Sequence, residues 1–255
     1  MISVIHNTYE RNIYVEESAT LNVKALEESG LDYQYIIFND KGDEGIYEDV
    51  KNILSDKVEY HYSEFNYGMG ICSGGWVGAI PLLKGKYVHN IGQDDVYTSI
   101  FYQTLFNNLQ DPNVYLTYSN GFKVNSQLNF LGQTLGPMQH LDYSKPIDVF
   151  NAWFGREGNT LTRANNYIPA PGVVYKKELH DIIGEPDLNN FKGSADFEYW
   201  ARVLFNNLGV VYEPRPLWLY RMSEYSLGSK PLAEREHVNW NNSILKKYQE
   251  CLTQL

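Results

Sequence analysis

The sequence predicts an α/β fold built around a mainly parallel β-sheet. Over the first 120 residues, short apolar or β-branched runs alternate with amphipathic stretches of helical length. A strand–helix–strand order of this kind favours parallel strands with helices on both faces of the sheet. The chain has 255 residues, of which 43% are hydrophobic and 20% charged. This size and composition are typical of one globular domain with a sizeable core.

The elements of the first half follow from residue spacing. The run Tyr33–Phe38 is aromatic and β-branched throughout, as in strands that are buried on both faces. Apolar residues recur at helical spacing after Asn12, and Gly30 ends that pattern. The same reasoning predicts strands at 2–7, 33–38, 58–62, 86–91 and 114–119, and helices at 12–29, 45–54, 70–83 and 97–109.

The second half is less regular. Residues 120–166 are rich in Asn, Gln, Gly and aromatic residues, and we expect long loops there. The strongest helical pattern in the chain is Ser194–Asn207, whose apolar residues form a single stripe. Trp200 lies on this stripe and is expected in the core, whereas Glu198 is expected to face solvent. Further strands are predicted at 172–175, 209–212 and 217–220, and further helices at 176–183 and 232–252.

Charge and composition exclude several classes of protein. The net charge of −10 disfavours a nucleic-acid-binding protein, which needs a basic surface, and disfavours docking on anionic lipid. No signal peptide and no run of 18 apolar residues is visible, so no membrane segment is expected. Cys72 and Cys251 form neither a disulfide framework nor a metal-binding pattern. These features predict a cytoplasmic protein with reduced thiols.

Polar residues follow three of the first four predicted strands. They are Asn7-Thr8-Tyr9-Glu10, Asn39-Asp40 and Gln93-Asp94-Asp95. Ligands of open α/β sheets bind beyond the carboxyl ends of the strands. We therefore expect these groups to form a ligand site at one edge of the sheet.

Each candidate group has a functional and a structural interpretation. Asp94 and Asp95 offer oxygen ligands for Mg²⁺ or Mn²⁺, or Asp95 caps the following helix. Asp40 could accept a hydrogen bond from an imide N–H such as that of uracil, or form an Asx-turn. Asp196 could be a general base, or a first-turn acid of a helix that Ser194 caps.

A glycine-rich run, Asn66-Tyr67-Gly68-Met69-Gly70, continues to Gly74-Gly75 at the predicted third helix. Such glycines let backbone N–H groups approach a phosphate, or let a helix pack closely on a sheet. The run has neither the Walker pattern nor the third glycine of a dinucleotide-binding fingerprint, and it follows the third strand instead of the first. A dinucleotide oxidoreductase is therefore disfavoured.

Taken in order, these motifs resemble the family 2 glycosyltransferases, the large inverting group with the GT-A fold. The matching motifs are Asn7-Thr8-Tyr9-Glu10-Arg11, Asn39-Asp40-Lys41-Gly42-Asp43, Asn66-Tyr67-Gly68, Gly85-Lys86-Tyr87 before Asp94-Asp95, Asp196-Phe197-Glu198-Tyr199-Trp200-Ala201-Arg202, and Leu217-Trp218-Leu219-Tyr220-Arg221. The resemblance covers about residues 2–110 and 168–226. The sequence departs from the family at Gly92, which replaces the first Asp of Asp-x-Asp, and at Ala195, where Glu is common.

The resemblance implies a role for each motif. The whole chain, 1–255, would be one GT-A domain, with a nucleotide-sugar-binding half (1–119), an acceptor and catalytic half (120–230) and a C-terminal helix (231–255). Asp196 would be the general base, and Asp94, aided by Asp95, would hold Mn²⁺ or Mg²⁺. The residues expected at the donor are Thr8, Tyr9, Glu10, Asp40, Asn66, Gly68, Gln93, Asp94 and Arg221. Those expected at the acceptor are Trp153, Phe154 and Tyr225.

The implied reaction is sugar transfer from a nucleotide-diphosphate sugar, with a UDP-sugar favoured, to a hydroxyl of a glycan or glycoconjugate such as a surface polysaccharide. An alternative is a nucleotide-sugar-binding protein of the same fold with impaired catalysis, suggested by Gly92 and Ala195. A nucleotidyltransferase would need a basic glycine-rich signature near the first strand, and Asn7-Thr8-Tyr9-Glu10 does not provide one.

Overall fold

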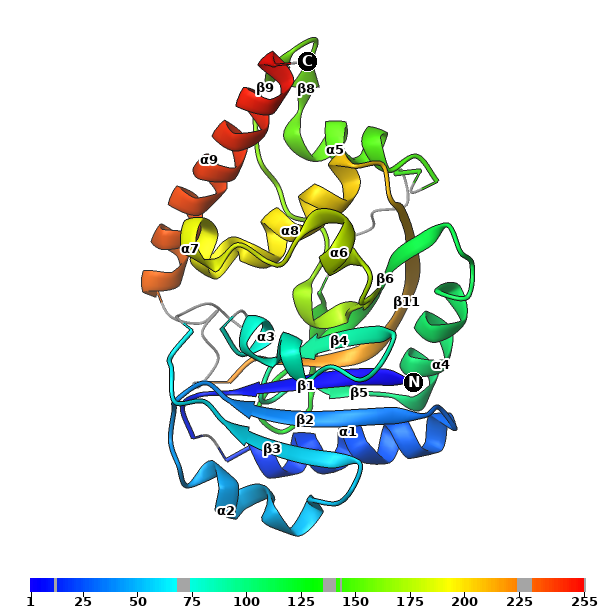
Figure 1. The fold of residues 1–255 in the computed structure, drawn as a ribbon, viewed down its shortest axis with the longest axis vertical. Helices are drawn as coiled ribbons and strands as arrows, with labels where there is room; N and C mark the ends of the chain where they lie inside the picture. Colours follow the sequence, from blue (N-terminus) through cyan, green and yellow to red (C-terminus); the bar gives the residue numbers. More distant parts are fainter. Residues whose placement is uncertain (12, 68–73, 135–140, 143, 224–230, 255) are drawn as a thin grey trace.

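The computed structural model describes the chain except residues 12, 68–73, 135–140, 143, 224–230 and 255 and the side chains of 231–239. Its centre is a β-sheet with helices on both faces (Figure 1). The described residues form a nine-stranded sheet in the order β3-β2-β1-β4-β10-β6-β11-β5, with β7 paired to β6. The predicted α/β class is therefore confirmed.

The amino-terminal part of the sheet is parallel, as predicted. It contains β1 (Ile2–Thr8), β2 (Tyr33–Asn39), β3 (Val58–Tyr62) and β4 (Tyr87–Ile91). β1 pairs in parallel with both β2 and β4, and β2 pairs in parallel with β3. Thr8 lies opposite Asn39, and His6 lies opposite Ile91. These pairs align the carboxyl ends of the strands, so the polar segments that follow them share one edge.

The rest of the sheet is mixed. β10 (Val173–Lys176) is antiparallel to β4 and to β6 (Val114–Val124), and β11 (Gly209–Arg221) is parallel to β6. β5 (Val96–Tyr97) pairs antiparallel with β11. The two strands predicted between 209 and 220 are one strand, whose register shifts at Pro216. Proline lacks the N–H that continues a ladder, which explains the irregularity.

The stretch 120–166 is more ordered than predicted. β6 continues to Val124 and turns into β7 (Phe130–Gln133). After the undescribed residues come α5 (Pro146–Phe154) and a small hairpin of β8 (Arg156–Glu157) and β9 (Thr160–Leu161). Polar composition suggested loops, but β7 is an exposed edge strand that buries little apolar surface.

Helices cover both faces of the sheet. One face carries α1 (Val15–Ser29) and α4 (Ser99–Asn108), and α2 (Ile46–Val50) with the 3₁₀ turn Lys51–Ile53 follows β2. The other face carries α3, α6 and α8, and α5 and α9 pack on the far side of α8 (Figure 1). The helices on this side are α3 (Gly74–Ala79), α6 (Leu179–Ile183), α7 (Leu188–Phe191), α8 (Ala195–Phe205) and α9 (Pro231–Thr253). Short 3₁₀ turns span Ile80–Leu82, Ala170–Gly172 and Lys192–Ser194.

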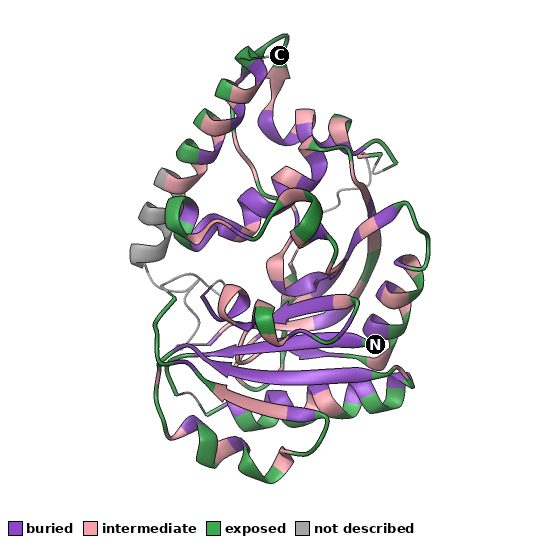
Figure 2. Cartoon of the chain, in the orientation of Figure 1, coloured by how far each residue is buried: buried purple, intermediate pink, exposed green. Residues whose placement is uncertain are grey.

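The core consists of two apolar clusters, one on each face of the sheet (Figure 2). Alternate residues of β1 serve different clusters: Val4 packs under α1, and Ile5 packs under α3 and α8. Because both faces are covered, every residue of β1 and β2 is buried. This explains the continuous apolar runs seen in the sequence. Within the described residues, no helix combines the length and apolarity that crossing a membrane requires.

Candidate functional site

Asn7 marks the point where the first strand meets the third helix. Its amide nitrogen donates to Asn90 Oδ1 at 2.6 Å and to the Ile91 carbonyl at 2.9 Å, which joins the ends of β1 and β4. Its Oδ1 is buried and has no hydrogen-bond partner in the described part of the protein. A Cβ atom on Gly75 would lie 2.2 Å from this oxygen. The glycine at the start of α3 therefore allows the close approach that was one interpretation of this run.

Asp40 follows β2 and is nearly fully buried. Its Oδ1 accepts the backbone N–H of Tyr67 at 2.8 Å, and burial raises the pKa of its carboxyl group. The turn after β2 is held by Asn39, whose Oδ1 accepts the N–H of Gly42 at 2.7 Å. The Asx-turn considered for Asp40 thus belongs to Asn39. Asp40 instead links the end of β2 to the segment that enters the glycine-rich run.

The other expected donor residues divide into internal and exposed groups. Thr8 is buried, and its hydroxyl donates to the Phe38 carbonyl at 3.3 Å. Tyr9, Glu10 and Asn66 are exposed beside this strand edge. Gly68 lies outside the described residues. Phe65, which was not among the predicted site residues, is also exposed and lies two residues before Tyr67, whose N–H bonds to Asp40. An aromatic residue between a strand end and a glycine run was the available signal.

The two adjacent aspartates after β4 have different environments. Asp94, like Gln93, is partly exposed, whereas Asp95 is buried. The Asp95 carbonyl accepts the Asn22 side chain at 3.0 Å. Burial and the charge of Asp94 raise the pKa of Asp95 well above its usual value. Asp95 does not cap the following helix, because Thr98 Oγ1 accepts the Phe101 N–H there. Asp94 is therefore the more accessible carboxylate of the pair.

A divalent cation fits this edge as an ion shared with the substrate. No cluster of three or more His, Cys, Asp or Glu residues suited to a metal occurs among the described residues. Asp94 provides one partly exposed carboxylate, whose Oδ2 lies 3.4 Å from the hydroxyl of Ser223. Mg²⁺ is commonly held by one or two carboxylates together with substrate phosphates and water. The donor set at Asp94 matches this arrangement and does not form a closed protein cage.

Arg221 lies inside the protein and not at the surface of the site. It is 1% exposed, and its guanidinium donates to Glu17, to the Ser126 carbonyl and to the Asp94 carbonyl at 2.7, 2.8 and 3.2 Å. The guanidinium carbon also lies 4.2 Å from the centre of the Tyr14 ring. The expectation that Arg221 contacts the donor diphosphate is therefore wrong for this conformation. Its guanidinium donors join β11 to α1, to the turn after β6 and to the loop after β4.

Asp196 begins α8 and is partly exposed. The surrounding protein removes water from its carboxyl group and raises its pKa to about 6, while backbone N–H groups of Asp196 and Phe197 partly oppose the shift. Ser194 does not cap the helix with its side chain. A carboxyl group with a pKa near 6 is ionised at neutral pH and is more basic than an ordinary aspartate, which suits a general base.

Helix α3 connects Asp196 to the edge of the sheet. Gly75 meets Asn7, and the next residue, Trp76, packs against Tyr199 and Trp200 with ring centres 5.3 and 5.4 Å apart. Trp200 is buried, as predicted, and lies one turn beyond Asp196. The middle of α8, one turn beyond Asp196, is thereby held against α3, whose Gly75 lies at the carboxyl ends of β1 and β2.

Glu198 is fully buried, so the prediction that it faces solvent is wrong. Arg202 and Lys247 each place a nitrogen 2.5 Å from its carboxylate, and the Tyr248 hydroxyl lies 3.3 Å away. These contacts fasten α8 to the C-terminal helix. The spacing of Glu198 and Arg202, four residues apart on a helix, was the signal available in the sequence.

The expected acceptor platform is not at the surface. Trp153 and Phe154 are both fully buried. Their rings pack against Phe197 at centre distances of 6.0 and 5.9 Å, between α5 and α8. The assignment of these two residues to an acceptor is therefore corrected: they form core. Tyr225 lies outside the described residues.

Comparison with solved structures identifies the fold. No protein-family model matches the chain, and no curated protein matches it. The chain is similar to S. aureus TarS 1-349, with 16% identity and a TM-score of 0.57 over 86% of this chain and 60% of that one. The same protein solved with UDP-GlcNAc gives 16% identity and a TM-score of 0.58 over 97% and 71%.

A second similar structure is the mannosyltransferase PcManGT from Pyrobaculum calidifontis, in complex with GDP-Man and Mn²⁺. It has 12% identity and a TM-score of 0.62 over 94% of this chain and 62% of that one. The chain thus spans about three fifths of the first TarS structure and of the mannosyltransferase. At these identities the likeness establishes the fold: the chain has the GT-A-like fold of these glycosyltransferases.

Proposed function

We propose that this protein transfers a sugar from a nucleotide-diphosphate sugar to a hydroxyl group of a glycan or glycoconjugate, with inversion at the anomeric carbon. The observation that carries the proposal is Asp196, a partly exposed carboxylate with a pKa raised to about 6. It lies in the first turn of α8, which packs on Trp76 of α3, and α3 lies at the carboxyl ends of β1 and β2. Residues 1–119 would bind the donor, 120–230 the acceptor, and α9 would close the structure.

The donor would lie across the strand ends. Asp40, with its raised pKa, would accept the imide N–H of uracil, and Tyr9, Glu10, Asn66 and Gln93 would line the nucleotide. A UDP-sugar is favoured because Asp40 provides an acceptor for this edge. The UDP-GlcNAc complex of TarS supports this choice, while the GDP-Man complex of the mannosyltransferase keeps a guanosine donor as a test condition.

The reaction would be a single displacement. The acceptor oxygen forms a bond to the anomeric carbon as the bond from that carbon to the diphosphate oxygen breaks. Asp196 takes the hydroxyl proton, and the electron pair of the broken bond leaves with the diphosphate. Mn²⁺ or Mg²⁺ held by Asp94 would neutralise the charge that develops on the leaving group. Asp95 would support Asp94 from inside the protein, since it is buried.

A catalytically impaired nucleotide-sugar-binding protein is the second candidate. Gly92 favours it, because this position offers no carboxylate to the donor ribose where the resembled family carries one. Such a protein would bind the nucleotide without turning over the sugar. Retention of both Asp94 and Asp196 favours the enzyme.

The test begins with thermal-shift measurements with UDP, GDP, dTDP and CMP, each with and without Mn²⁺. We expect one nucleotide to raise the melting temperature and Mn²⁺ to increase that shift. Asp94→Asn should remove the metal-dependent part. Donor turnover is then measured with the nucleotide-sugar so identified, and Asp196→Asn should reduce it by about 10²–10⁴-fold while nucleotide binding persists. Binding without any turnover would favour the second candidate, and no shift with any nucleotide would refute both.

A further inference from the structure

The most heavily used buried cation near the proposed donor site is Arg221, the last residue of β11. Its guanidinium contacts α1 through Glu17 and Tyr14, the turn after β6 through the Ser126 carbonyl, and the loop after β4 through the Asp94 carbonyl. Its own backbone N–H lies 3.4 Å from Asp95 Oδ1. Burying a guanidinium is costly unless its donors are paired. Here the pairing is spread over segments distant in sequence.

These contacts act on the segment that carries the proposed metal ligand. Nε donates to the carbonyl of Asp94 at 3.2 Å, so it fixes the peptide plane from which the Asp94 side chain projects. The Asp95 carboxyl and carbonyl are held on the other side by the Arg221 N–H and by Asn22. The carboxylate of Asp94 itself is left partly exposed. The backbone is restrained while the ligand oxygens face outward.

Glu17 compensates the positive charge of Arg221, which would otherwise weaken the binding of a cation at Asp94. A guanidinium beside a divalent ion repels it, and this repulsion is strong in a partly buried site. Glu17 Oε2 lies 2.7 Å from Nη2 and neutralises the arginine. Arg221 and Glu17 together therefore give a neutral restraint behind Asp94.

We propose that Arg221 and Glu17 form a positioning pair, which holds the Asp94 backbone so that its carboxylate meets the divalent cation of the donor diphosphate. This inference rests on the proposed function. It assigns to Arg221 a role through Asp94 and not through contact with the donor.

The charges and the geometry predict opposite results for one substitution. Arg221→Met leaves Glu17 as an unpaired negative charge, which by electrostatics alone would strengthen Mn²⁺ binding. If Arg221 positions Asp94, the same change weakens Mn²⁺ binding. Substitutions of residues that orient a metal ligand typically weaken binding about 10–100-fold.

The experiment measures the dissociation constant of Mn²⁺ by electron paramagnetic resonance, which counts free Mn²⁺, in the presence of saturating UDP or, if UDP does not bind, GDP. We expect Arg221→Met to weaken Mn²⁺ binding about tenfold or more and Arg221→Lys, which keeps the charge but not the planar fork of donors, to weaken it less. Glu17→Gln should weaken it about threefold, because it exposes the ion to an uncompensated cation. Nucleotide affinity in EDTA should not change.

Arg202→Met is the matched control. Arg202 is a second largely buried arginine that pairs with a glutamate, but it lies in α8 and contacts Glu198, Ile183 and Glu185. It should lower the melting temperature without changing Mn²⁺ affinity. Unchanged or tighter Mn²⁺ binding in Arg221→Met overturns the inference, and so does equal weakening in Arg202→Met. If Arg221→Met does not fold, Arg221→Lys decides: it keeps the positive charge, so weaker Mn²⁺ binding reports the lost positioning contacts, and unchanged binding overturns the inference. Wild-type protein that binds neither nucleotide would instead refute the proposed function.

Discussion

Replacing Asp196 by asparagine should stabilise the folded protein while it removes the proposed base. The protein around Asp196 raises its pKa from 3.8 to about 6. A raised pKa means that the folded state favours the protonated carboxyl group and is penalised when this group ionises. Each difference of one between the folded and unfolded pKa corresponds to about 1.4 kcal/mol, so charging Asp196 costs folding about 3 kcal/mol.

The sign of the effect fixes its pH dependence. Below about pH 3.8 the carboxyl group is protonated in both states and carries no penalty. The penalty grows as pH rises from there to about 6, and it is complete above that value. Asparagine is neutral throughout. The stability gained by Asp196→Asn should therefore reach about 1–3 kcal/mol at pH 7.5, the lower values reflecting the partial exposure of the side chain, and only about a third of that at pH 4.5.

The assay is equilibrium unfolding in urea at pH 4.5, 6 and 7.5, with wild type and variant compared at each pH. Asp148→Asn is the control, because Asp148 also lies in the first turn of a helix but is exposed. Its charge favours the helix dipole, so this control should lose about 0.3–1 kcal/mol at pH 7.5. If Asp196→Asn is as destabilising as Asp148→Asn, or if its effect is independent of pH, then the raised pKa of Asp196 and the argument for its basicity are refuted.

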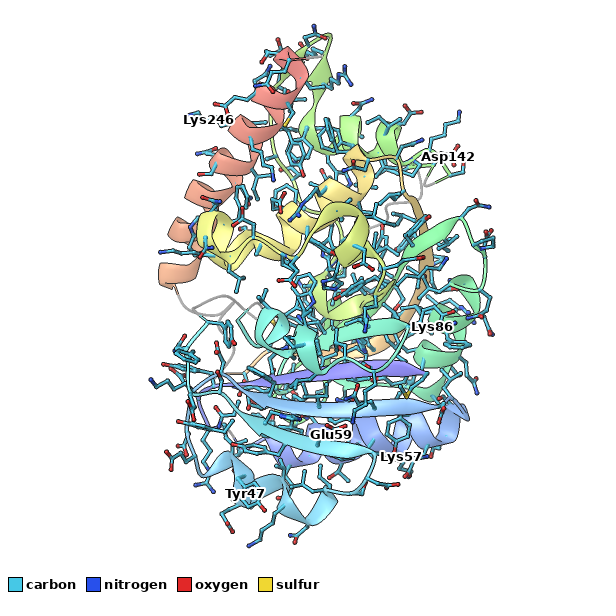
Figure 3. All side chains as sticks on the ribbon, viewed as in Figure 1. Tyr47, Lys57, Glu59, Lys86, Asp142 and Lys246 are labelled. Carbon is cyan, nitrogen blue, oxygen red and sulfur yellow. The ribbon has the colours of Figure 1, made fainter. Side chains whose placement is uncertain are left out.

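Three further outcomes are expected. The rate of sugar transfer should fall about tenfold for each pH step of one below about 6, because Asp196 must be ionised to accept a proton, and a rate that stays level down to pH 5 would exclude it as the base. Lys247→Met should lower the free energy of unfolding by about 1–3 kcal/mol, because it removes one partner of the fully buried Glu198. The control is Lys246→Met on the outer side of α9 (Figure 3), which should change the free energy of unfolding by less than about 0.5 kcal/mol. Asp94→Asn should weaken Mn²⁺ binding in the presence of nucleotide by about tenfold, and Asp95→Asn by less than about twofold. Calorimetric titration measures both affinities, and an equal loss of Mn²⁺ affinity in the two variants would contradict the assignment of Asp94 as the outward ligand.

The sequence allowed the parallel part of the sheet to be predicted because its strands are buried on both faces. Every residue of Tyr33–Asn39 is buried, so the whole run had to be apolar or internally paired. The stretch 120–166 escaped prediction for the opposite reason. β7 is exposed at the edge of the sheet, where polar residues are tolerated and the pattern of alternation disappears. Aromatic residues gave no better guide: Trp153 could equally stack on a sugar or fill the core, and only the packing of α5 on α8 decides.

The misassigned charged residues share one physical cause. Glu198 and Arg221 are charged, and charged residues are almost always exposed unless they are paired. Each is buried here because its partners come from elements far away in sequence: Lys247 for Glu198, and Glu17 for Arg221. These two long-range pairings are not visible in the sequence, and the Glu198–Arg202 spacing, which is visible, is equally typical of an exposed ion pair on a helix.

The same reasoning explains why adjacent aspartates cannot serve the ligand equally. Asp94 and Asp95 lie in the short segment between β4 and β5, where Asp94 is partly exposed and Asp95 is buried, so one carboxyl group reaches the surface and the other lies inside the protein. The inner group must then be paired, and Asp95 meets the N–H of Arg221. An arginine that holds the inner carboxyl and the outer residue's carbonyl together determines how the outer carboxylate is presented. Under the proposed function, Gly92 offers no carboxylate, so Asp94 would be the outward ligand of this segment, and a bound cation would depend more strongly on the restraint behind it.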